Sequence, residues 1–138
     1  MNSDLDKIEK IAVDLYPFAF SLYPDELMAG QLIVDGLMRM IVDDNLDASA
    51  LKSKDLPSFC LSIFTLAKSR KGHILIKDED PFYQDLPLHT RAVLFLKEKW
   101  KWNHSEIENA TGLTYNEVVL SLHEGRGLLF SRKESLTL

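Results

Sequence analysis

The side chains that could do chemistry are scattered along this chain of 138 residues. Its four histidines stand at no spacing typical of metal ligands: His73, His89, His104 and His123. We therefore expect no metal site. The acidic run at residues 78–80 could hold calcium, but no glycine or distal glutamate completes a calcium loop around it. We interpret this run as part of a charged linker.

Catalysis has no support in the residue pattern. The chain has no glycine-rich phosphate loop, no Gly-x-Ser-x-Gly and no His-Glu-x-x-His. The aspartates within residues 43–47 could form a carboxylate pair, but they follow a predicted helix end and are typical of a solvated turn. Cys60, the single cysteine, excludes an internal disulfide and lies on an apolar stripe, which predicts a buried thiol. We expect a binding protein and not an enzyme, with no cofactor and no small-molecule substrate.

Composition and charge narrow the class of partner. An apolar content of 46% suffices for a core. Residues 1–50 hold ten acidic and three basic side chains, and the whole chain carries a net charge of −5. This balance excludes a protein that coats nucleic acid by bulk positive charge. No apolar run approaches the roughly 18 residues of a membrane span. The N-terminal residues lack a signal-peptide pattern, so we expect a cytoplasmic protein with no membrane contact.

Every convincing apolar pattern has the helical period. Apolar stripes predict helices within residues 8–22, 28–41, 59–67 and 88–100. Pro17 interrupts the first stripe and either kinks or divides that helix. Only residues 73–77 resemble a strand, and five residues alone cannot make a sheet. The predicted fold class is therefore all-α, with two small helical domains at residues 1–72 and 83–138 joined by a linker at 73–82.

The most specific stretch lies in the second predicted domain. Ser105 to Glu108 has the spacing of a capping box, and Thr114 to Glu117 has the same spacing. Gly112 lies between them and can adopt the left-handed conformation that ends helices. Two capped helices joined by a glycine-containing turn predict a helix-turn-helix. An ordinary helical hairpin is the alternative interpretation.

Both halves of the chain carry motifs of one protein family. In the second half these are Leu86-Pro87, Arg91-Ala92-Val93-Leu94, Ser105-Glu106-Ile107, Gly112-Leu113-Thr114, Val118, Leu122-His123 and Arg126. In the first half they are the runs at residues 29–40 and 63–70. In content and order these motifs resemble bacterial sigma-70-type factors of the short, extracytoplasmic-function group. The resemblance implies a transcription protein that binds RNA polymerase and directs promoter-specific initiation.

The resemblance also implies roles for single residues. The helix at residues 29–40 would dock on the clamp coiled coil of RNA polymerase, or on another partner, through Leu32, Asp35, Leu37, Met38 and Arg39. The residues that would face the −10 element are Lys68, Arg70 and Lys71. Those that would face the −35 element are Asn116, Ser121 and Arg126.

The second helix of the predicted helix-turn-helix departs from the family pattern. Val119 and Ser121 stand where the family carries lysine and arginine, and residues 105–130 hold four acids and one base. Because DNA contact depends on cations, we expect weak promoter affinity. The alternative function is a sigma mimic that binds an anti-sigma-type protein without binding DNA. The apolar Val119 and Leu120 either pack against the first half or form a docking face for a partner. The short linker favours a compact monomer whose first half partly covers this helix.

Overall fold

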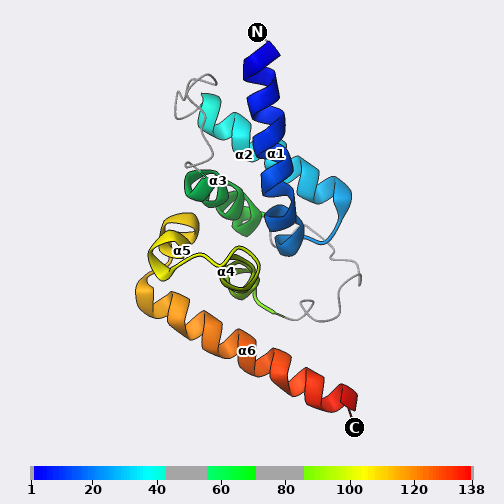
Figure 1. Ribbon diagram of the computed structural model, residues 1–138, viewed down its shortest axis with the longest axis vertical. Helices are drawn as coiled ribbons and strands as arrows, with labels where there is room; N and C mark the ends of the chain where they lie inside the picture. Colours follow the sequence, from blue (N-terminus) through cyan, green and yellow to red (C-terminus); the bar gives the residue numbers. More distant parts are fainter. Residues whose placement is uncertain (1, 43–55, 71–85, 138) are drawn as a thin grey trace.

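The computed structural model describes residues 2–42, 56–70 and 86–137. It contains six helices in these ranges (Figure 1): α1 (Asn2–Leu22), α2 (Glu26–Val42), α3 (Leu56–Ser69), α4 (Leu88–Glu98), α5 (His104–Thr111) and α6 (Tyr115–Thr137). No strand occurs in the described part of the chain, so the predicted all-α class is confirmed. The strand-like run at 73–77 and the linker at 73–82 lie outside the described residues.

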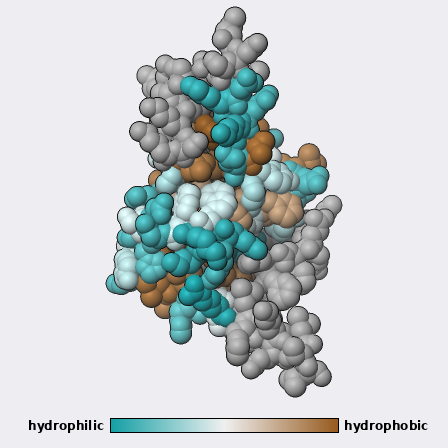
Figure 2. All heavy atoms as spheres, in the orientation of Figure 1, coloured by the Kyte–Doolittle hydropathy of each residue, from teal (hydrophilic) through white to brown (hydrophobic). Residues whose placement is uncertain are grey.

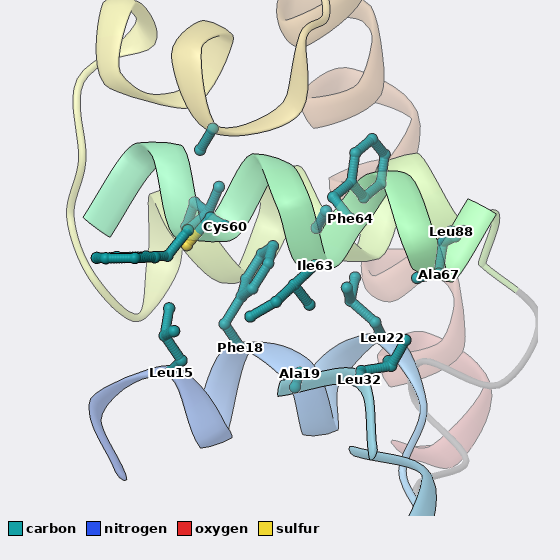
Figure 3. Close-up of a cluster of buried hydrophobic side chains, with 14 of the residues drawn as sticks. Leu15, Phe18, Ala19, Leu22, Leu32, Cys60, Ile63, Phe64, Ala67 and Leu88 are labelled. Carbon is teal, nitrogen blue, oxygen red and sulfur yellow. The ribbon is translucent and has the colours of Figure 1, made fainter. Parts of the chain in front are cut away.

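The first apolar stripe forms one continuous helix. Pro17 lies inside α1 on its exposed side, and the helix continues to Leu22, so the proline does not divide it. The buried face of α1 includes Ile11, Leu15, Phe18, Ala19 and Leu22. Figure 3 shows several of these side chains pointing toward α3. The stripe thus packs one long helix against the core.

Helices α2 and α3 approach each other closely at a glycine. A Cβ atom at Gly36 would lie 2.9 Å from Cγ1 of Ile63, so only a glycine fits this contact without a shift. The hydroxyl of Ser62 donates a hydrogen bond of 2.9 Å to the Gly36 carbonyl oxygen. This close approach fixes which side of α2 faces inward.

The turn between α5 and α6 follows the predicted pattern with one shift. The N-cap of α5 is Asn103, whose Oδ1 accepts from the Glu106 amide at 2.8 Å while Glu106 Oε1 accepts from the Asn103 amide at 3.1 Å. The prediction that Ser105 caps this helix is therefore wrong. Gly112 ends α5 with a φ of 73°, as predicted.

The capping box at the start of α6 is confirmed. Thr114 Oγ1 accepts from the Glu117 amide at 3.2 Å, and Glu117 Oε1 accepts from the Thr114 amide at 3.1 Å. Two reciprocal bonds satisfy amide groups that the first turn of a helix leaves without partners. They fix where α6 begins and hence which of its residues face outward.

The two halves of the chain share one core. Helix α1 packs against α4, and α3 packs against α5, so the buried apolar residues of both halves form a single cluster. Phe18 of α1 lies with its ring centroid 5.9 Å from that of Phe95 and 6.0 Å from that of Trp100. The division into two domains stays a prediction, and the described helices form a continuous interior across its boundary.

A buried arginine joins the end of α1 to the start of α4. Arg91, 5% exposed, donates from Nη1 to the Leu22 carbonyl oxygen at 2.8 Å and from Nε to the Leu86 carbonyl oxygen at 3.1 Å. Burial lowers the pKa of Arg91. Its charge lies at the C-terminal end of α1, where the helix dipole favours a cation. Next to it, Tyr23 donates from its hydroxyl to the Ala67 carbonyl oxygen at 3.0 Å.

Candidate interaction surfaces on α2 and α6

Two of the residues predicted to contact polymerase lie in the core. Leu32 is fully buried and Leu37 is 5% exposed. The inward face of α2 is set by its packing on α1 and α3, and both leucines belong to it. They stabilise the fold and are not available to a partner, which corrects the prediction.

The outward face of α2 is apolar over much of its length. Met38 is 51% exposed and Arg39 beside it is also exposed. They line a shallow groove of about 490 Å³ together with Asp35, Val42 and Leu66. The exposed residues Leu27 and Val34 extend this face toward the N-terminus of α2. Neither residue belongs to the predicted site, although both are apolar residues outside the core stripe, which was the available signal.

One residue of the predicted polymerase-binding set and one residue of the predicted −10 set form an ion pair with each other. Arg70 Nη2 lies 2.5 Å from Asp35 Oδ2, and Gln31 Nε2 donates to Asp35 Oδ1 at 2.9 Å. The hydrogen bond from Arg70 is the largest cause of a lowered pKa of the Asp35 carboxyl group. Arg70, expected to face DNA, thus pairs with α2, and its charge is balanced within the chain.

The other two cations of the predicted −10 set have different surroundings. Lys68 is exposed, and its Nζ lies 5.0 Å from the centroid of the Phe64 ring. Lys71 lies outside the described residues. Of the three cations in this set, the structure therefore leaves one exposed cation, Lys68, in the described part of α3.

The predicted −35 set is divided by the orientation of α6. Asn116 and Arg126 are exposed, whereas Ser121 is 3% exposed and faces inward with Val118 and Gly125. These inward positions have the 3.6-residue period and pack toward α4. Ser121 therefore cannot face DNA, which corrects the prediction.

The exposed cation of this set is balanced by a carboxylate. Arg126 Nη2 lies 2.8 Å from Glu98 Oε1, and Arg126 Nε donates to the same oxygen at 2.9 Å. The pair joins α6 to the end of α4. A phosphate would have to compete with Glu98 for this guanidinium group.

Val119 and Leu120 lie at the surface. They are 40% and 57% exposed, so the prediction that the first half covers them is wrong for the described residues, and so is the core interpretation. Tyr115, 54% exposed, lies one turn before Val119, and its ring centroid is 5.1 Å from that of His104. Figure 2 shows hydrophobic side chains reaching the surface between hydrophilic ones on the face it presents.

Two carboxylates lie on the same part of α6 as these apolar residues. The hydrogen bonds from Thr114 are the largest causes of a lowered pKa of Glu117, and the nearby charges of His89 and Lys68 lower it further. Glu124 is exposed on the same helix. The exposed first half of α6 therefore presents apolar side chains and carboxylates, an arrangement suited to protein contact.

The remaining reactive groups give no further site. Cys60 is buried in the core, and burial raises the pKa of its thiol. In the described part of the chain, no group of three histidine, cysteine or acidic side chains could hold a metal ion, and no helix there is long and apolar enough to cross a membrane. Comparison with protein-family models, with curated proteins and with solved structures found no match to this chain.

Proposed function

We propose that this chain is a sigma-factor-like transcription protein that acts through protein contacts, as a sigma mimic for an anti-sigma-type protein. The resemblance of residues 29–40, 63–70 and 82–129 to sigma factors supports the transcription role. The outward face of α6 supports the mimic. At the place where the family reads the −35 element, this face presents Val119 and Leu120, 40% and 57% exposed.

The physical reason lies in what DNA requires. Promoter binding depends on cations that neutralise phosphates and on polar groups that reach base edges. Arg126 is paired with Glu98, and Ser121 faces the interior. Two exposed apolar side chains offer DNA little, whereas a protein partner gains free energy by covering them.

A second candidate function is a working sigma factor that binds RNA polymerase core. The observation that favours it is the exposed pair Met38 and Arg39 beside the groove on α2, the helix whose sequence resembles the polymerase-docking helix. In this version Lys97, Lys99 and Lys101, near the end of α4, add positive charge for promoter DNA.

DNA binding by the full chain separates the two candidates. Promoter-like and random duplexes are titrated at low and moderate salt, with the mimic expected to bind both weakly and with a shallow dependence of log K on log salt. Tight binding of the promoter-like duplex alone, with a steep salt dependence, would instead establish the working sigma factor.

The partner is identified by capture from a lysate of the host. The immobilised full chain is compared with Leu120→Ser on α6 and Met38→Ser on α2, which alter side chains of similar exposure, 57% and 51%. We expect a small anti-sigma-type protein that the wild-type chain and Met38→Ser retain and Leu120→Ser loses. Recovery of polymerase core subunits, lost with Met38→Ser, would favour the second candidate. Recovery of neither class would contradict the transcription role.

A further inference from the structure

Leu120 lies between two carboxylates on the exposed surface of α6. Glu117 stands three residues before it and Glu124 four residues after it, and these spacings make them neighbours on one side of a helix. All three side chains are exposed. The capping bonds with Thr114 hold Glu117 in place, and its lowered pKa keeps it ionised.

The surroundings leave this strip negative. Arg126, the one base within residues 105–130, is paired with Glu98 on α4. His89 and Lys68 lie close enough to Glu117 to lower its pKa, but they belong to α4 and α3 and lie at one end of the strip. Leu120, at 57% exposure, supplies the apolar area between the two carboxylates, and Val119, at 40%, lies about 100° further around the helix.

We propose that this strip, made of Glu117, Leu120 and Glu124, docks a basic amphipathic helix of a partner protein. The partner helix would cover Leu120 with apolar side chains. Lysine or arginine before and after this apolar contact would pair with Glu117 and Glu124, which are about 10 Å apart along α6. The proposal rests on the proposed function only for the partner's role in transcription.

Charge decides against the other occupants of the strip. A second copy of this chain would bring the same two carboxylates against Glu117 and Glu124, and like charges repel. Duplex DNA would bring phosphates to the same carboxylates. A helix with apolar and basic side chains matches both the apolar centre and the negative rim.

The test uses two synthetic peptides and the full chain. Both peptides are about 20 residues long, enough for a helix to form on binding, and share the same leucine positions. One carries lysines beside the leucines and the other carries glutamates. We expect the lysine peptide to bind at least about tenfold more tightly than the glutamate peptide at low salt.

Single substitutions test whether the lysine peptide binds to α6. Leu120→Ser is expected to weaken the binding of the lysine peptide about tenfold, and Glu124→Gln is expected to weaken it about threefold. Leu27→Ser is the matched control, because Leu27 is 82% exposed on α2. It should leave the affinity unchanged. Circular dichroism of each variant checks that helix content is retained.

Several results would overturn the proposal. Equal affinity for the two peptides would show that the charge of the partner helix does not matter. Equal weakening of peptide binding by Leu27→Ser and Leu120→Ser would exclude α6 as the binding site. Self-association that Leu120→Ser abolishes would make a second copy the occupant, and tight duplex binding through α6 would make DNA the occupant. Peptide binding that depends on Leu120, with no transcription protein captured from the lysate, would support this proposal and contradict the proposed function.

Discussion

Two glycines of α6 provide a matched test of how closely this helix packs. A Cβ atom at Gly125 would lie 2.6 Å from Cδ1 of Leu94 and 2.8 Å from Cγ2 of Thr90. Both neighbours are buried, so neither side chain has free space to move into. At Gly127, two residues further on, a Cβ atom would meet nothing within 4 Å.

The same substitution should therefore have different effects at the two positions. Alanine in place of a helical glycine stabilises a helix by about 1 kcal/mol, which applies to both. At Gly125 an overpacking cost of about 1–3 kcal/mol opposes this gain. We expect Gly127→Ala to raise the free energy of unfolding by up to about 1 kcal/mol, and Gly125→Ala to lie about 1–3 kcal/mol below it.

Urea unfolding followed by circular dichroism measures both values, and fluorescence of Trp100 and Trp102 provides a second probe. Coincident transitions for the two probes would justify a two-state treatment. Equal stabilisation by Gly125→Ala and Gly127→Ala would refute the reasoning, because it would mean that α4 and α6 are further apart than the structure has them.

Three further predictions concern the cap, the thiol and the ion pair. Asn103→Ala should lower the free energy of unfolding by about 1 kcal/mol, whereas Ser105→Ala should change it by less than about 0.5 kcal/mol in urea unfolding. Cys60 should not react with a thiol reagent at pH 8 until the chain unfolds, since burial raises its pKa, and fast labelling of the native protein would contradict this. The Asp35–Arg70 pair lowers the pKa of Asp35, so its contribution, under about 1 kcal/mol, is present above the ordinary pKa of 3.8 and is lost as pH falls through the lowered value. The stability difference between wild type and Asp35→Asn should therefore shrink in acid unfolding, and a constant difference would exclude the pair as its cause.

The helices could be predicted because their signals are local. The capping box of Thr114 and Glu117 and the left-handed Gly112 need only neighbours in the sequence, and both occur as predicted. The predicted N-cap of α5 lies two residues after the observed one, because two overlapping capping patterns fit the same stretch. Asn103 with Glu106 has the same spacing as Ser105 with Glu108, and asparagine caps a helix as well as serine does.

The orientation of the candidate surfaces could not be predicted in the same way. Ser121 faces inward because Gly125, four residues later, lets α4 come close to this side of α6. Leu32 faces inward because α2 packs on both α1 and α3. Such choices depend on contacts between helices far apart in the sequence, and the position of a residue in a family motif does not determine them.

On the proposed function, weak promoter binding would come from the side chains of α6 and not from the way the halves pack. A cover supplied by the first half would have left α6 able to bind DNA once the halves separated. Val119 and Leu120 are exposed while α1 packs on α4 and α3 packs on α5, so the outward face is accessible in the closed arrangement. Separating the halves would expose the buried Phe18 and break the Arg91 bond to α1 without adding a cation to α6. A partner that recognises this face therefore gains nothing from opening the fold and is expected to bind the closed form.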